Sequence, residues 1–591
     1  AATARKNGEA FAGAVRCGIM RDPMSVSACE YFSEDPYLTA ELLKSCRTDD
    51  VGFVFTNSLG QGEYTDRIAD ERALNELYLF PLKKAGKFAA ALQLDGGYLN
   101  GEKISASRAC SDRLVKYVRS DAAVVTEYTC GAELNDFTGG AYILGADGAF
   151  KRELYKAVVD GKIIESKLDR SIERMLATAV NTYELYKKEP SERIANAAMP
   201  DISRASSVLL KNDGILPFAE KSSVALFGNA ADFCDGAKFD IRPIARASDG
   251  RGAFNVFLIT DYERDGIPNE TCSAIAAVAS TAPTAVVICG ACACELGTLK
   301  NANAIIFCPA CRDVANILDM ITERAPQGRL PFTWCDKRSD YPCNGNICAK
   351  RGDFRYESMY NGYMLFGNFK SNVAFPFGHG LDYTDYEIGR VDLKSDGAKI
   401  AATFDVKNVG KRAGTAVCQA YLTAVNAPAY GLKKRLAAVE RVKLEAGESK
   451  RVTMTADASD LAVYDAENAC FVTLGGKYGV DIGLSSADIR ASGEVKLIGT
   501  RSVACADEKS VPAYYAYGSA FEPTAPEIEK LLKVPFIKRS EPRAELAPQP
   551  SAVVAKAIKR AKKTAAKQVL PLIEHKIAST PKAYSPPLRK R

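Results

Sequence analysis

The middle of the chain alternates short apolar runs with helical patterns. Four runs consist entirely of Val, Ile, Leu, Phe and Ala and do not alternate with polar residues. They are residues 224–227, 256–259, 285–288 and 304–307. Strands that are apolar on both sides are typical of a parallel sheet covered by helices on both faces. We therefore predict that residues 205–340 form an α/β domain with a parallel sheet.

The patterns on either side of this region differ. Leu74, Leu77, Tyr78 and Leu82 recur at helical spacing after Asp70, and a second helix is expected from about Ser166. Between them, residues 122–126 form a short apolar run, as a buried strand would. Residues 388–490 contain short alternating strands separated by turn residues, which indicates a small β-sandwich.

Composition fits a soluble multidomain protein. The chain has 591 residues, 47% hydrophobic and 25% charged, and at about 150 residues per domain it should form three or four units. No apolar run is long enough for a transmembrane helix, and no secretory signal is expected at the start. Eighteen irregularly spaced cysteines favour free thiols in a reducing, intracellular compartment. No cofactor is implied.

The charge is unevenly distributed. Residues 551–591 hold eleven Lys or Arg and one acidic residue, Glu574, although the whole chain carries only +6. This basic, Pro/Ala/Lys-rich tail is expected to dock on an acidic protein, a membrane surface or RNA.

Several long segments, read in order, resemble glycoside hydrolase family 3, the family of β-glucosidases and β-xylosidases. They cover most of residues 18–495. The matching segments are E-Y-F-S-E-D-P-Y-L at 30–38, S-V-L-L-K-N-D-G-I-L-P at 207–217, G-R-L-P-F-T at 328–333, F-P-F-G-H-G-L-D-Y-T at 375–384 and V-K-N-V-G at 406–410.

This resemblance implies an α/β multidomain fold in three parts and an extension. They are a partial TIM-like barrel at 1–185, an α/β sandwich at 186–383, a fibronectin type III-like β-sandwich at 384–500 and the tail-bearing extension at 501–591. The E-D-P-Y-L segment comes early in the chain, so the resemblance predicts a truncated barrel that a protein partner covers.

The resemblance also implies catalytic positions. Retaining glycosidases use two carboxyl groups, one as nucleophile and one as acid/base. The family's V-x-D-W nucleophile run matches residues 124–128, which puts Glu127 at the nucleophile position. Glu263, in a loop after the strand at 256–259, is the best acid/base candidate.

Other family site residues are missing. The Lys-His pair of the K-H-F motif falls on residues 53–57 and is absent, the sugar-binding arginine falls within 25–30 and is absent, and Asp95-Gly96-Gly97 replaces an S-Y-N run. We therefore expect a catalytically inactive protein repurposed as a structural subunit of an assembly, unlikely to take a sugar. The alternative is a weak or altered β-glycosidase that uses Glu127.

Two cysteine pairs have the spacing of a zinc ribbon. Cys289 and Cys292 form one pair, and Cys308 and Cys311 form the other. Both pairs follow predicted strands, where thiols commonly pack as small apolar side chains, so no metal is expected and zinc is the alternative.

Overall fold

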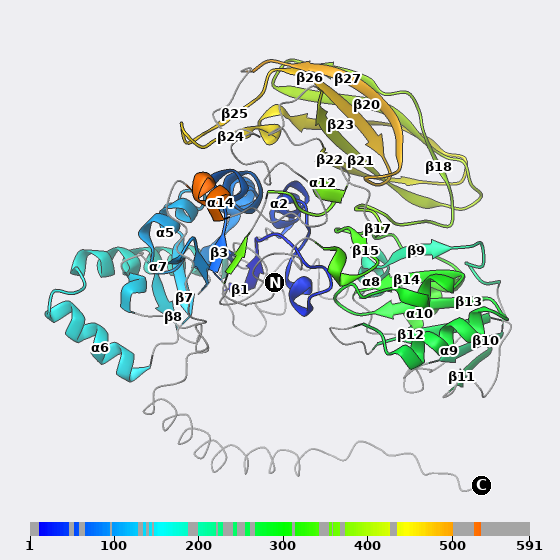
Figure 1. Ribbon diagram of the computed structural model, residues 1–591, viewed down its shortest axis with the longest axis horizontal. Helices are drawn as coiled ribbons and strands as arrows, with labels where there is room; N and C mark the ends of the chain where they lie inside the picture. Colours follow the sequence, from blue (N-terminus) through cyan, green and yellow to red (C-terminus); the bar gives the residue numbers. More distant parts are fainter. Residues whose placement is uncertain are drawn as a thin grey trace, which may run out of the picture. The chain divides into compact units, whose positions relative to one another are not determined.

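The computed structural model describes eighteen segments of the chain (Figure 1). These are residues 11–46, 52–57, 66–94, 97–127, 134–137, 141–144, 147–186, 199–219, 223–227, 240–244, 254–260, 266–309, 314–341, 354–356, 359–366, 373–425, 434–499 and 525–532. The basic tail at 551–591 lies outside them, so its docking stays a prediction. No helix within these segments is both long and apolar enough to cross a membrane.

A five-stranded parallel sheet near the N-terminus forms the partial barrel (Figure 1, blue to cyan). Its strands follow one another in chain order, as barrel strands do: β1 (Phe11–Arg16), β2 (Gly52–Asn57), β4 (Ala91–Leu94), β7 (Ala123–Glu127) and β8 (Tyr142–Leu144). Helices α2 (Pro36–Ser45), α4 (Phe80–Ala85) and α5 (Arg108–Val115) pack on one face through a common apolar core. The predicted strand at 122–126 is β7.

Two helices follow β8. Helix α6 (Gly148–Val159) packs near Ile143, and the long helix α7 (Glu165–Tyr186) places Met175 against the other face of the sheet. The hydroxyl of Thr178 on α7 accepts a hydrogen bond from the backbone N–H of Ala123 at 2.7 Å, which fixes α7 at the start of β7.

The second sheet is mostly parallel, as predicted. Its strand order is β11 (Asp240–Ile244), β10 (Ser223–Phe227), β12 (Phe254–Ile259), β13 (Thr284–Cys289), β14 (Ala304–Cys308) and β9 (Val208–Asn212). Only β9 runs antiparallel within it. Apolar clusters lie on both faces and include side chains of α9 (Asn269–Ala279) and α10 (Val314–Thr322), which explains why these strands have no polar side.

The third unit is the expected β-sandwich. One sheet contains β18 (Tyr386–Ile388), β19 (Asp392–Ser395), β20 (Lys399–Asn408) and β23 (Ser449–Asp457), and the other contains β22 (Arg435–Leu444), β21 (Gly414–Ala424), β26 (Gly476–Gly483) and β27 (Ile489–Leu497). Their inward side chains form one apolar core. The fold class inferred from the resemblance is therefore confirmed.

Shorter elements complete the described chain. They are η1 (Val26–Glu30), β3 (Asp66–Ile68), α3 (Glu71–Ala73), η2 (Leu74–Tyr78), η3 (Gly86–Phe88), β5 (Tyr98–Leu99), β6 (Glu102–Lys103), η5 (Leu134–Phe137), α8 (Met199–Ser206), η8 (Gly297–Asn301), β15 (Trp334–Cys335), η9 (Arg338–Asp340), β16 (Phe354–Tyr356), α12 (Tyr363–Phe366), β17 (Val373–Phe375), η10 (Ala458–Leu461), β24 (Val463–Asp465), β25 (Cys470–Val472) and α14 (Ala525–Leu532).

One tyrosine joins the partial barrel to the β-sandwich. The hydroxyl of Tyr363 donates to Asp35 at 2.7 Å and accepts the backbone N–H of Leu436, on β22, at 2.8 Å. Its ring contacts those of Phe377 and Tyr421, whose centroids lie 4.7 and 5.7 Å away. All five residues are buried, so the barrel and the sandwich share one continuous interior.

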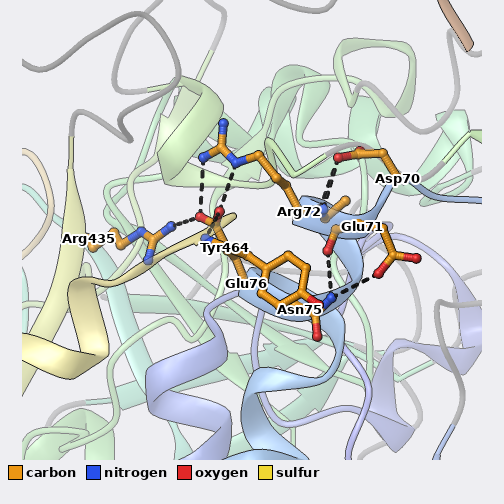
Figure 2. A network of polar contacts seen from close by, with 8 residues as sticks. Asp70, Glu71, Arg72, Asn75, Glu76, Arg435 and Tyr464 are labelled. Carbon is orange, nitrogen blue, oxygen red and sulfur yellow. Dashed lines mark hydrogen bonds and ion pairs between the residues drawn. The ribbon is translucent and has the colours of Figure 1, made fainter. Parts of the chain in front are cut away.

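A buried network of ion pairs and hydrogen bonds forms a second contact between the barrel and the sandwich (Figure 2). The carboxylate of Glu76, in the π-helix η2, accepts hydrogen bonds from Nε of Arg72 at 2.8 Å and from the backbone N–H of Tyr464 at 2.9 Å. The guanidinium of Arg435, on β22, also donates to it. Burial alone would raise the pKa of Glu76, but the two arginines lower it below its ordinary value.

Glu34 is a buried carboxyl group that joins the barrel to the α/β unit. It accepts the backbone N–H and the hydroxyl of Thr333, and the backbone N–H of Tyr363, each at 2.8 Å. Gly362, at φ 49°, lies so close that any β-carbon there would overlap the carboxyl group. Burial raises the pKa of Glu34 to about 7, although these hydrogen bonds oppose the shift.

We therefore expect the protein to become more stable as the pH falls from 7.5 to 5.5. A carboxyl group whose pKa is higher in the folded state stabilises the fold when protonated, and this stability is lost as the pH rises through the folded pKa. For Glu34 the change should be about 1–3 kcal/mol in the free energy of unfolding, measured by urea denaturation at each pH. Asp35 and Asp70, whose pKa values burial raises to about 6, act in the same direction.

Glu34→Gln tests this assignment, because the variant cannot titrate at this position. It should reduce the pH dependence, whereas Glu440→Gln, at an exposed position, should leave it unchanged. Equal pH dependence in the native chain and in Glu34→Gln would contradict the assignment.

Candidate active site

The carboxyl edge of the five-stranded sheet carries a row of polar positions. The strand register aligns Arg16, Thr56 and Gln93 on one face, each at or one residue before the carboxyl end of its strand. The same register continues through Val125 to Tyr142, the first residue of β8. The hydroxyl of Thr56 lies 3.3 Å from Oε1 of Gln93, so two neighbouring strands present hydrogen-bonding groups together. In barrels of this kind the carboxyl edge is where substrates bind.

Glu127 is the last residue of β7, at this edge. Its backbone pairs with Leu144 of β8, and it lies two positions beyond Val125. Because residues alternate between the faces of a strand, position 127 belongs to the face of the polar row. The side chain of Glu127 is not among those that the structure describes, so its role as the nucleophile stays a prediction.

The segment that lacks the sugar-binding arginine follows β1. Residues 26–30 form the short helix η1, and the hydroxyls of Ser25 and Ser27 lie 3.0 Å apart. Arg16, the last residue of β1, forms an ion pair with Glu30 at 2.7 Å. A cation is therefore present at this edge, although it comes from the strand and not from the loop.

A second cation, which is fully buried, was missed in the sequence. Arg67, on β3, is 1% exposed, and a β-carbon at Gly97 would lie only 2.9 Å from its Nη1 atom. Gly97 belongs to the stretch that replaces the S-Y-N run, just beyond the end of β4. Gly97 has no side chain and therefore leaves room for the guanidinium of Arg67. In the sequence, this glycine was the only sign that another group occupies the space.

Two of the remaining candidates cannot be placed relative to this edge, and the described cysteines lie in the α/β unit. Glu263 and Cys311 lie outside the described residues. Cys289 and Cys308 are register partners on β13 and β14 and pack in an apolar cluster, where the hydroxyl of Ser207 donates to the sulfur of Cys308 at 3.0 Å. Cys292 follows β13, and in the described segments no group of three or more His, Cys, Asp or Glu side chains could hold a metal ion.

His379 also lies away from the sheet edge. Its Nε2 atom is 2.8 Å from the carbonyl oxygen of Leu210, on β9, and its ring stacks on Phe375. Burial lowers the pKa of His379 below its ordinary value. These contacts fit a structural role.

Comparisons with known proteins give a domain family and relatives for this chain. Residues 416–486 match the fibronectin type III-like domain family. The thermostable β-glucosidase B of Acetivibrio thermocellus is 28% identical over 569 residues, covering 82% of this chain and 74% of the relative. A Bacteroides ovatus β-glucosidase is 24% identical, covering 80% of this chain and 79% of the relative.

The fold agrees as well. The structure of Thermotoga neapolitana β-glucosidase 3B in complex with glucose is similar, with a TM-score of 0.73 and 21% identity over 84% of this chain and 85% of that one.

These relatives correct one expectation from the sequence. The interpretation as a catalytically inactive structural subunit is wrong, as are the pseudoenzyme and scaffold descriptions, because relatives over most of the chain are named β-glucosidases. The interpretation gave too much weight to the absence of the family's motif residues. Arg16 and Arg67 place cations beside Glu30 and Gly97, in the segments where motif residues are missing. The chain is thus a homologue of the family 3 β-glucosidases over most of its length, with a fibronectin type III-like domain towards its C-terminal end.

Proposed function

We propose that this protein is a retaining β-glycosidase that acts on β-glucosides, with Glu127 as its nucleophile. The observation that carries the proposal is the position of Glu127. It ends a strand of a parallel sheet, at the edge where barrel enzymes bind substrate, in a chain whose relatives over most of its length are β-glucosidases.

The chemistry follows from this position. The carboxylate of Glu127 attacks the anomeric carbon, and the bond from that carbon to the aglycone oxygen breaks. A second carboxyl group, for which Glu263 is our candidate, donates its proton to the departing oxygen. The same group then removes a proton from water, which attacks the glycosyl–enzyme ester, releases the sugar with its original configuration and restores the Glu127 carboxylate.

The polar row supplies partners for sugar hydroxyls. The hydroxyl of Thr56 and the amide of Gln93 act together on neighbouring strands, and Arg67 brings a buried positive charge close to the end of β4. Hydrogen bonds to a charged donor contribute more than those between neutral groups, so Arg67 is proposed to take over part of the role of the missing cations.

Covalent trapping tests the proposal. A 2-deoxy-2-fluoro-β-glucoside with a good leaving group should form a glycosyl–enzyme ester that hydrolyses slowly, because fluorine destabilises the positively charged transition state. We expect the native chain to gain the mass of one fluorosugar, and the labelled peptide to contain Glu127. Labelling of another carboxylate would reassign the nucleophile, and no labelling together with no hydrolysis of aryl β-glucosides would overturn the proposal.

We also propose that α6 and α7 form a protein contact surface. The exposed apolar side chains of the two helices and of the turn between them are Tyr155, Val159, Ile164, Ile172, Leu176, Val180 and Tyr183, and the last four lie along one side of α7. A helix that is apolar on both sides is expected to be covered on both sides. The proposed occupant is a second copy of the chain, because most soluble oligomers are homo-oligomers and dimers are the commonest of them.

The molecular mass of the purified protein in dilute solution tests whether this surface forms a dimer contact. We expect a dimer for the native protein, and a monomer of unchanged unfolding midpoint for Leu176→Glu combined with Val180→Glu. A native chain that is monomeric over the whole concentration range would contradict the proposed contact.

A further inference from the structure

A large cavity lies where the three units meet, and the proposed glycosidase chemistry does not use it. Its volume is about 580 Å³, within the range of about 300–1,000 Å³ that is typical of small-molecule sites. The barrel contributes Met20 and Tyr31, the α/β unit contributes Phe307 and Phe332, and the sandwich contributes Val417 and Leu436.

The position of the cavity in the α/β unit is typical of a binding site. Ala291 and Pro309 line it, and they follow the carboxyl ends of the neighbouring parallel strands β13 and β14. In open α/β sheets, ligands bind outside the carboxyl ends of the strands. Among the described residues of the polar row, none of Arg16, Thr56, Gln93 and Tyr142 lines the cavity, so the cavity lies apart from that row.

Most of the lining is apolar, and among the described lining residues two arginines carry the charged groups. Arg329 and Arg441 both line the cavity, and neither forms an ion pair with any residue that the structure describes. Arg329 donates one hydrogen bond, from Nη1 to the carbonyl oxygen of Gly328 at 2.9 Å, and its buried Nε atom has no partner in the described residues.

Asp382 compensates the charge of Arg329 only in part, because its carboxylate has other hydrogen-bond partners. The carboxylate of Asp382 accepts hydrogen bonds from the hydroxyl of Tyr386 at 2.6 Å and from the backbone N–H of Thr415 at 3.1 Å. Burial and the like charge of Arg441 lower the pKa of Arg329, although Asp382 opposes the shift. A negative charge placed in the cavity would therefore be attracted by both arginines.

The other polar side chains of the lining, apart from the thiol of Cys29, are Ser206, Gln327 and Gln419, and each already has a partner. The hydroxyl of Ser206 donates to the carbonyl oxygen of Ser203 at 3.1 Å, and the amide of Gln327 donates to the hydroxyl of Thr415 at 3.3 Å. The amide of Gln419 donates to the carbonyl oxygens of Gly378 and Leu484, at 3.1 and 2.8 Å, and accepts the hydroxyl of Tyr421 at 2.6 Å. A neutral sugar, which needs many hydrogen-bond partners, would find few here. Cys29 and Arg441 are exposed, so a ligand can enter from solvent.

We propose that this cavity binds an apolar molecule with a single anionic head group, a long-chain carboxylate being the simplest case. Arg329 and Arg441 hold the head group, and the apolar body lies against Met20, Phe332 and Leu436. This ligand is independent of the sugar substrate, and its binding does not depend on Glu127.

Fluorescence titration of the full chain with cis-parinarate, a polyene carboxylate that brightens in apolar sites, tests the proposal. We expect saturable binding of one molecule per chain, and roughly tenfold weaker binding for the uncharged methyl ester. Arg441→Met, at an exposed position, should weaken binding of the acid by a similar factor, as should Arg329→Met.

Ala291→Trp should abolish binding, because the indole would fill part of the cavity from an exposed position. Arg451→Met, an exposed arginine of the sandwich outside the cavity, is the matched control and should bind the acid as the native chain does. Absence of saturable binding, equal affinity for acid and ester, or unchanged binding in Ala291→Trp would each overturn the proposal.

Discussion

Glu127→Gln is expected to lower kcat for an aryl β-glucoside by about 10³-fold or more, as removal of a catalytic nucleophile does in other hydrolases. The amide has almost the shape of the carboxylate but cannot form the ester with the anomeric carbon. KM should change much less, because the groups that contact sugar hydroxyls stay in place. Initial rates with a 4-nitrophenyl β-glucoside measure both constants.

Chemical rescue makes this prediction specific. In Glu127→Ala, added azide should occupy the vacated space, attack the anomeric carbon and release the aglycone, which gives a glycosyl azide of inverted configuration. Glu165→Gln, on α7 and exposed, is the matched control and should keep the native rate. Full activity in Glu127→Gln would show that another group is the nucleophile.

Arg435→Met should lower the free energy of unfolding by about 3 kcal/mol or more, because it leaves the buried carboxylate of Glu76 with one cation fewer. Both residues are nearly inaccessible to solvent, and their ion pair crosses from the sandwich to the barrel (Figure 2). Urea unfolding monitored by the intrinsic fluorescence of Trp334, the single tryptophan, measures the change.

A double-mutant cycle separates this pair from its surroundings. Glu76→Gln should also destabilise the protein, but the double variant should cost less than the sum of the two single changes, because the pair is then removed together. Arg451→Met breaks an ion pair with Asp392 in which both side chains are mostly exposed, and it should change stability by roughly 0.5 kcal/mol or less. If Arg435→Met lowered the free energy of unfolding no more than Arg451→Met does, the ion pair between Arg435 and Glu76 would not contribute to stability.

The elements that the sequence predicted well are those that depend on local pattern. The runs at 224–227, 256–259, 285–288 and 304–307 became β10, β12, β13 and β14, because a strand that is buried on both faces must be apolar throughout. The helix expected from about Ser166 begins one residue earlier, at Glu165.

The features that the sequence did not reveal depend on distant contacts. Glu34 reads as part of an ordinary helix start, yet its environment comes from Thr333 and Tyr363, about three hundred residues away. Glu76 lies in an amphipathic stripe, and only the approach of Arg435 and Tyr464 explains why a carboxylate is buried there. Likewise, no short segment encodes the cavity, since three units supply its walls.

The contacts of Tyr363 have a consequence for how this architecture can be recombined. The hydroxyl of Tyr363 bonds both to Asp35 of the barrel and to the backbone of Leu436 in the sandwich, so the facing surfaces of the two units must match each other. The sandwich is therefore not an interchangeable module. A chimaera that takes the sandwich of a distant relative would lose the match at Tyr363 and Tyr421 and expose a common interior. Exchange is therefore expected to succeed only when the segment around Tyr363 is transferred along with the sandwich.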